Sequence, residues 1–205
     1  GPDAAFYTAD RFVHHIDRRA RQELAVFYGT MIHPGDRVLD LMAGWESHLP
    51  DNLRPLHMHG VGLNANELAG NPALTAQTIQ DLNTTPQLAF EDNEFDRAIC
   101  SLSVEYLTDP IPIFREVARV LRPGGTFSVS FSNRWFPEKA IRIWEDLHDF
   151  ERMGLVTEYF LQSNCFNAIS TFSSRGIPRP HDDAYFPEYR LSDPVYAVTG
   201  QAMAR

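Results

Sequence analysis

The sequence has few of the residues that mark disulfide-rich, metal-binding or nucleic-acid-binding proteins. Its 205 residues include only two cysteines, Cys100 and Cys165, which are too few for a disulfide framework and lack the spacing of a metal site. Lysine and arginine total 18 against 27 acidic residues, so the formal net charge is −9. Proteins that bind nucleic acids gather basic side chains to neutralise phosphates. We therefore expect a protein of the reducing cytoplasm, with no metal and no nucleic-acid partner.

Long apolar segments are also missing. No apolar run approaches the roughly 18 residues that a membrane-spanning helix needs, and the N-terminus has no basic region followed by a hydrophobic one. This pattern predicts an untargeted protein with no membrane partner. The dipeptide Gly1-Pro2 is typical of what remains after tag cleavage, so it is left out of the fold prediction.

The composition that is present suits one compact domain. Hydrophobic residues make up 43% of the chain and aromatic residues 12%, enough for a single sizeable core. We expect one domain over residues 3–205, with an N-terminal helical lid segment over 3–36 and the core over 37–205. A monomer or a homodimer is expected.

Strand and helix patterns alternate along the chain. Apolar residues spaced by three and four predict a first helix over 10–28, capped by Asp10 and ended by Gly29. Its polar residues form either a solvated face or part of a lid over a site. Short apolar runs predict strands over residues 38–43, 58–63, 76–81, 97–101, 126–133, 165–172 and 194–202. Further helices are predicted over residues 47–53, 64–75, 109–122, 137–150 and 155–162.

This order predicts an α/β fold, a Rossmann-like doubly wound sheet of seven strands that is mostly parallel with an antiparallel last strand. The last two strands have no clear helix between them, which indicates a hairpin at the sheet edge. Residues 174–193, which join them, contain several prolines and aspartates and are longer than ordinary connections. We expect this loop on the surface, near a site or a partner.

The turn after the first strand has too few glycines for a dinucleotide. A G-x-G-x-x-G fingerprint would place glycines where this sequence has Met42, Gly44 and Ser47. With the middle glycine alone, the backbone does not approach a pyrophosphate closely at several points. An NAD-linked oxidoreductase is therefore a distant alternative.

Several strand ends together resemble the class I S-adenosylmethionine-dependent methyltransferases. The resemblance covers most of the chain and rests on VLDLMAG (38–44), VGLN (61–64), QDL (80–82) and the block 94–127. That last block is similar to the fourth-strand, helix and fifth-strand region of the type-11 methyltransferases. An antiparallel last strand also fits this family.

The chain departs from the family pattern in its first two motifs. The family usually has glycines where Met42 and Glu46 stand, and an acid where Asn64 stands. The first motif, DLMAGWESHLP, is similar to that of a little-characterised subgroup with DLM and SHLP, which indicates no particular substrate.

The resemblance implies S-adenosylmethionine as the cofactor. The residues it assigns to cofactor binding are Asp40, Met42, Gly44, Trp45, Asn64, Asp81, Leu82 and Ser101. Asp40 would face the methionine ammonium, Asn64 the ribose hydroxyls, and Asp81 with Leu82 the adenine. Five of these also have a structural interpretation: Asp40 as a cap of the turn, Asn64 as a helix cap, Asp81 as a loop acid, Ser101 as part of a helix-start network and Trp45 as a core side chain.

The implied reaction is in-line methyl transfer to a small-molecule acceptor, which needs a general base only if the acceptor arrives protonated. His15 is the candidate base, with Asp17 or Glu105 as its partner, because histidine titrates in the useful range. The candidate substrate contacts are Tyr7, His48, Tyr106 and Arg134. The missing glycines and Asn64 leave open a second interpretation, a non-catalytic S-adenosylmethionine-binding module or pseudoenzyme.

Overall fold

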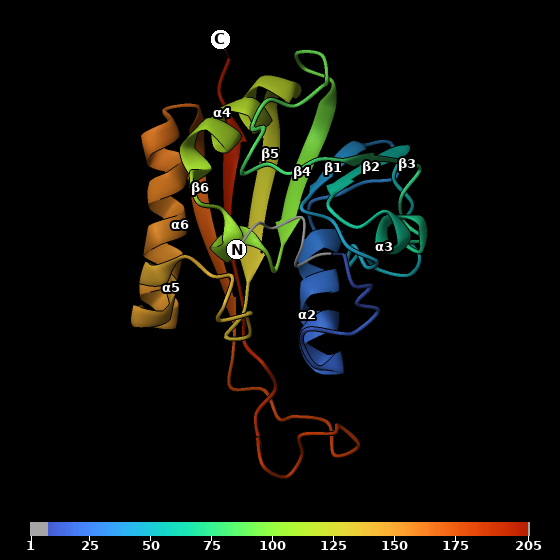
Figure 1. Ribbon diagram of the computed structural model, residues 1–205, viewed down its shortest axis with the longest axis vertical. Coiled ribbons are helices and arrows are strands. Elements are labelled where there is room, and N and C mark those ends of the chain that lie inside the picture. Colours follow the sequence, from blue (N-terminus) through green and yellow to red (C-terminus); the bar gives the residue numbers. More distant parts are fainter. Residues whose placement is uncertain (1–7, 205) are drawn as a thin grey trace.

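The computed structural model describes residues 8–204, so the expected substrate contact Tyr7 lies outside the described residues. At its centre is a seven-stranded sheet in the order β3-β2-β1-β4-β5-β7-β6 (Figure 1). The strands are β1 (Arg37–Leu41), β2 (His57–Gly62), β3 (Ala76–Ile79), β4 (Phe95–Ser101), β5 (Leu121–Phe131), β6 (Phe166–Ser174) and β7 (Val195–Ala202). Strands β1 to β5 pair in parallel, and β7 is antiparallel to both of its neighbours. The predicted Rossmann-like sheet and its terminal hairpin are confirmed.

Helices cover both faces of the sheet. They are α2 (Arg18–Gly29), α3 (Ala65–Ala69), the 3₁₀ turn η1 (Val104–Tyr106), α4 (Pro110–Val120), α5 (Arg142–Asp146) and α6 (Asp149–Ser163). One core cluster joins α4 and α6 to β4, β5 and β7, and a second joins α2 to the opposite face. Figure 1 shows α5 and α6 on one side of the sheet and α2 with α3 on the other.

The alternating residues of strand β5 pack against helices on both faces of the sheet. Phe127, Val129 and Phe131 are buried and belong to the α4 and α6 core. The intervening serines are buried as well, and Ser130 is hydrogen-bonded to the Tyr28 hydroxyl of α2 at 2.9 Å. Small hydroxyl residues let α2 pack closely over this face while their polar atoms stay satisfied. This confirms the expectation that helices cover both faces of the strand.

The first helix begins later than predicted. Asp17 is its N-cap, since its carboxylate accepts a hydrogen bond from the Ala20 backbone N–H at 2.9 Å. Residues 8–16 form an irregular strap instead, in which Val13 is 54% exposed. Asp10 as the helix cap was therefore wrong, because a better-placed aspartate lies seven residues later, next to the buried part of the apolar stripe.

The other short helices were also misjudged. No helix forms over 47–53, where His48 has a left-handed φ of 57° and Pro50 follows. The predicted helix over 64–75 is only α3, which ends at Ala69 with Gly70 as its C-cap. In the C-terminal half α5 is a single short turn, and α6 begins at the His148 cap, where the Glu151 carboxylate accepts from the His148 N–H at 2.8 Å.

Among residues 8–204, no helix has the length and apolar character that crossing a membrane requires.

Candidate active site

A cavity of about 530 Å³ opens at the carboxyl ends of β1, β2 and β4. This is the edge at which doubly wound sheets bind ligands. Its walls come from six stretches of chain: 13–15, 42–46, 62–64, 80–83, 101–103 and 133–137. His48, Glu67, Tyr106 and Leu107 complete the lining.

The structure brings most of the predicted site residues to this one cavity. Those that line it are His15, Met42, Gly44, Trp45, His48, Asn64, Asp81, Leu82, Ser101, Tyr106 and Arg134. Asp40, Asp17 and Glu105 are absent from its lining. Each of these three carboxylates has a different place in the fold.

The turn after β1 holds its backbone close to β2. Met42 has a φ of 53°, a left-handed conformation that favours glycine. The Ala43 N–H donates to the Val61 carbonyl at 2.8 Å. A Cβ on Gly62 would lie 2.3 Å from the Ala43 carbonyl oxygen, so only glycine fits there. At Gly44 a Cβ would lie 3.3 Å from a carboxylate oxygen of Glu67. Bare backbone at Gly44 therefore faces the cavity, as a ligand that approaches the main chain requires.

Asp40 lies behind this turn, and its side chain is not exposed to the cavity. It is 2% exposed, and its carboxylate accepts a hydrogen bond from the Ser47 hydroxyl at 2.7 Å. Asn71 in turn donates to the Ser47 hydroxyl at 2.8 Å and to the Gly44 carbonyl at 2.9 Å. Burial raises the pKa of Asp40 to about 7, although the bond from Ser47 opposes this shift. This geometry favours the turn-cap interpretation of Asp40 over direct contact with a ligand.

Asn64 caps α3 from the end of β2. Its side-chain oxygen accepts from the backbone N–H groups of Asn66 and Glu67 at 2.9 and 3.0 Å. Its amide nitrogen donates to the Asp10 carboxylate at 3.0 Å. The helix-cap interpretation of Asn64 therefore describes its contacts, while the same side chain also borders the cavity.

The end of β3 and the turn η1 form another wall. Leu82 is buried, and Asp81 accepts a hydrogen bond from the Asn83 N–H at 3.0 Å. The Asn83 amide donates to the Tyr106 carbonyl at 2.9 Å, which joins this loop to η1. The wall thus combines an apolar side chain with a carboxylate fixed by its own loop.

Three histidines and Glu46 form the polar part of the cavity near α2. Burial lowers the pKa of His15, which keeps its imidazole neutral at pH 7, and its ring meets the Phe136 ring edge-on at 5.5 Å. Burial also lowers the pKa of His48, to about 4. Glu46 accepts a hydrogen bond from His14 at 3.0 Å. A neutral imidazole at the edge of the cavity is able to accept a proton.

Glu105 does not accompany His15. It is 1% exposed, faces the core and has one carboxylate oxygen with no hydrogen-bond partner among the described residues. Burial raises its pKa to about 8 against the opposing charge of Arg152. The structure therefore gives no support to Glu105 as a partner of a base in the cavity.

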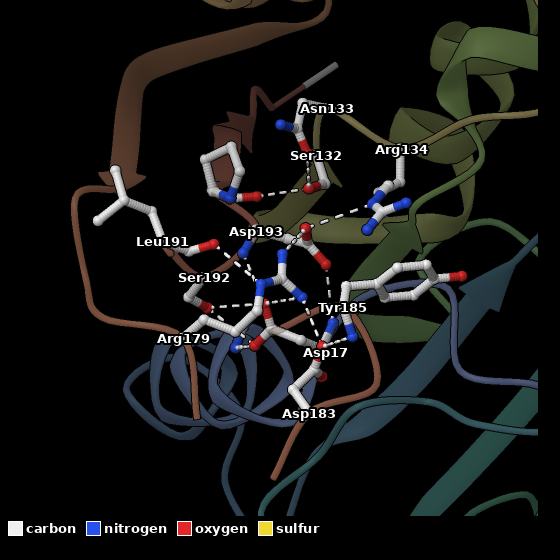
Figure 2. A network of polar contacts seen from close by, with 12 residues as sticks. Asp17, Ser132, Asn133, Arg134, Arg179, Asp183, Tyr185, Leu191, Ser192 and Asp193 are labelled. Carbon is white, nitrogen blue, oxygen red and sulfur yellow. Dashed lines mark hydrogen bonds and ion pairs between the residues drawn. The ribbon is translucent and has the colours of Figure 1, made fainter. Parts of the chain in front are cut away.

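Asp17 belongs to a buried network that joins α2 to the loop between β6 and β7 (Figure 2). Its carboxylate accepts from the Ser192 hydroxyl at 2.8 Å and from the Asp193 N–H at 2.6 Å. Arg179 donates to Asp193 at 2.7 Å and to Asp183 at 2.9 Å. These bonds occupy Asp17, so its role is to hold the loop.

A second cavity of about 330 Å³ lies between this network and the first cavity. His14, His15 and Arg134 line both. The Arg134 guanidinium lies 4.8 Å from the centre of the Tyr185 ring, and its Nε donates to Asp193 at 3.3 Å. The two cavities therefore meet around His15 and Arg134.

Some lining residues were missed from the sequence. Glu67 stands at the third position of α3 after its cap, a place where an acid normally stabilises the helix start, so its position over the cavity had no separate signal. Trp135 and Phe136 follow β5 in an irregular segment that was predicted to lead into a helix, and nothing in their spacing indicated a site.

Comparison with known proteins shows similarity to methyltransferases. The family described as a methyltransferase domain matches residues 52–129. The sterol 24-C-methyltransferase erg6 of Schizosaccharomyces pombe is 28% identical over 132 residues, which are 60% of this chain and 34% of that protein. A second curated relative is matched over only 9% of its length, so the chain spans about a third or less of these relatives.

Solved structures share the fold over nearly the whole chain. A chain of the Haloferax volcanii complex between the Trm112 methyltransferase activator and a methyltransferase superposes with a TM-score of 0.61 and 18% identity, covering 90% of this chain and 91% of that one. The [4+2]-cyclase SpnF superposes with a TM-score of 0.60 and 15% identity, covering 96% of this chain and 89% of that one. At these identities the likeness shows a common fold.

Proposed function

We propose that this chain is a class I S-adenosylmethionine-dependent methyltransferase that methylates a small-molecule acceptor, which is supported by its fold and by its methyltransferase-domain segment. The observation that carries the proposal is the cavity at the turn after β1, where Gly44 presents bare backbone beside polar and apolar walls from three strand ends. When bound, the cofactor supplies a methyl group on a positively charged sulfur.

The proposed cofactor contacts follow the cavity from β1 to β4. Gly44 and Trp45 border the methionine part, the end of β2 borders the ribose, and Asp81 with Leu82 borders the adenine. Met42 and Ser101 line the floor between them. Asp40 contributes indirectly, because its bond with Ser47 fixes the turn that Gly44 belongs to.

The acceptor is proposed to bind where the two cavities meet. His15, His48, Tyr106 and Arg134 line this side of the first cavity, and Phe136 adds an aromatic wall. Neutral His15 would take the proton of an acceptor that arrives protonated. The protein otherwise contributes alignment of the two reactants and exclusion of water, because in-line displacement at a sulfonium needs no covalent enzyme intermediate.

Titration calorimetry with S-adenosylmethionine, S-adenosylhomocysteine and NAD tests the proposal. We expect both sulfur compounds to bind more tightly than about 1 mM and NAD to bind more weakly, because the turn lacks the glycines that a pyrophosphate requires. Failure of both sulfur compounds to bind in that range would refute the proposed function. A Gly44→Leu variant, which fills the bare backbone position, should lose the binding while keeping the fold.

A non-catalytic cofactor-binding module is the second candidate. It is favoured by Met42 at a position that prefers glycine and by an amide in place of the usual acid at Asn64. A screen of metabolites for methylated products separates the two candidates, since a binding module would retain cofactor affinity and give no product with any acceptor.

A further inference from the structure

We propose that Glu67, rather than Asn64, binds the ribose hydroxyls of the cofactor. The inference rests on the proposed function, since it concerns the same cavity. It differs from the assignment that the sequence alone suggests, in which the residue at the end of β2 takes this role.

Asn64 is already engaged on both sides of its amide. Its oxygen accepts the two backbone N–H groups that begin α3, and its nitrogen donates to Asp10. A bond from Asn64 to a ribose hydroxyl would compete with the cap of a five-residue helix. An amide also lacks the charge-assisted strength with which a carboxylate accepts hydroxyl donors.

Glu67 supplies the carboxylate that is missing at position 64. It lies one helical turn further on and lines the same part of the cavity. One carboxylate oxygen accepts the Arg11 N–H at 2.8 Å. The other lies close to the bare backbone of Gly44, and no residue within 8–204 donates a hydrogen bond to it. This oxygen is available to accept hydroxyl hydrogen bonds, which is the recognition that a vicinal diol requires.

The N-terminal strap holds Glu67 in place. Besides the bond from Arg11 to Glu67, the Asp10 carboxylate accepts from the amides of Asn64 and Asn66 at 3.0 and 3.1 Å. Further along the strap, the Trp45 indole N–H donates to the Val13 carbonyl at 3.1 Å. The strap is thus bonded both to α3 and to the turn after β1. Glu67 keeps one oxygen for the strap and one for the ligand.

A calorimetric cycle on the full chain tests the assignment. S-adenosylhomocysteine and its 2′-deoxy analogue are titrated into the wild type and into Glu67→Gln. We expect Glu67→Gln to weaken the parent ligand by about tenfold or more, as is usual for a lost hydrogen bond to a charged group. The wild type should bind the deoxy analogue more weakly than S-adenosylhomocysteine. Glu67→Gln should bind the two ligands with nearly equal affinity.

Three further variants serve as controls for the experiment. Glu158→Gln on α6, an exposed acid away from the cavity, should bind as the wild type does. Glu67→Asp keeps the charge on a shorter side chain, so it should fold even if the amide variant does not and should show an intermediate loss. Asn64→Ala should lower the melting temperature while the variant still distinguishes the parent from the deoxy ligand.

The two proposals fail in different ways. If the wild type binds neither sulfur compound, the proposed function is refuted. If the wild type binds and both Glu67 variants keep full affinity and full discrimination against the deoxy analogue, the cofactor site stands and the role of Glu67 is overturned. Discrimination that disappears in Asn64→Ala instead would return the role to Asn64.

Discussion

Met42, Gly44 and Trp45 show how single residues reshape the turn after β1. Met42 occupies a left-handed conformation without being glycine, which costs about 1–2 kcal/mol. Its side chain packs partly against the core, which offsets some of that cost. Gly44 keeps the one position where a side chain would meet Glu67, and Trp45 binds the N-terminal strap. The turn therefore has large side chains at Met42 and Trp45, where the fold accommodates them, and glycine at position 44, where Glu67 lies close to the backbone.

At the level of single residues, we predict the effect of replacing His15 on turnover and on its pH dependence. Once an acceptor has been found, His15→Ala should lower turnover by about 100-fold or more if the acceptor arrives protonated. Because desolvation lowers the pKa of His15 below 6.5, the ordinary value, the wild-type rate should fall on acidification as the imidazole becomes protonated, with a midpoint below 6.5. The measurement is the pH profile of methyl transfer at saturating cofactor.

His33→Ala is the matched control, since His33 lies in the exposed turn before β1. A His15→Ala variant whose rate and pH profile equal those of the wild type would show that His15 is not the base.

Sequence reasoning succeeded for residues that follow strand ends, because parallel strands bring their carboxyl ends to one edge. It placed Leu82 and Ser101 in the cavity for this reason. It failed where a contact depends on chains distant in sequence. Nothing near Asp17 indicates that Ser192 and Asp193 occupy its carboxylate, and nothing near Asn64 indicates the approach of Asp10.

At the scale of elements, strands were predicted better than helices. Buried strands such as β4 and β5 have short apolar or alternating runs, a pattern that is typical of strands in a covered sheet. The short helices depend on local breaks: α3 ends at Ala69, before Gly70 and Asn71-Pro72, and the segment before α6 is divided by the cap at His148. Helical periodicity extends across such breaks. The pattern therefore predicted α3 and α5 as too long and α6 as too short.

Gly62 provides the prediction for this scale, because it joins β2 to the turn after β1. Gly62→Ala would place a methyl group 2.3 Å from the Ala43 carbonyl oxygen, so one of the two backbone segments must move. We expect the free energy of unfolding to fall by about 2–3 kcal/mol. Cofactor affinity should fall as well, since the same turn lines the cavity. Chemical denaturation and calorimetry measure the two effects.

Gly35→Ala is the matched control, because no atom lies within 4 Å of its added Cβ. Its free energy of unfolding should stay within about 0.5 kcal/mol of the wild type. Equal stability of the two variants would contradict the close packing at Gly62.

At the scale of the whole molecule, two segments far apart in the sequence border the two cavities. The N-terminal strap is bonded to α3 and to Trp45 beside the first cavity, and the loop between β6 and β7, which lines the second cavity, extends beyond the sheet (Figure 1). The sequence predicted a long loop near a site from its length and composition. It did not predict that α2 holds this loop, since the network joins residues more than 170 positions apart.

Arg179 is the centre of that attachment. It is 3% exposed, bonds Asp193, Asp183 and the Leu191 carbonyl, and lies 3.4 Å from the Asp17 carboxylate. Its removal leaves the buried Asp17 without a counter-charge and leaves Asp193 with Arg134 alone. Arg179→Ala should therefore release the loop, and chymotrypsin should cleave after Tyr185 or Tyr189 at least about tenfold faster than in the wild type. Arg190→Ala, an exposed change in the same loop, is the control and should be cleaved at the wild-type rate. Cleavage of Arg179→Ala at the wild-type rate would show that the network does not hold the loop.

The same variant tests whether the two cavities act separately. Because Arg179 lines only the second cavity, the affinity for S-adenosylhomocysteine should change little while acceptor turnover falls. A large loss of cofactor affinity would show that the two cavities do not act separately.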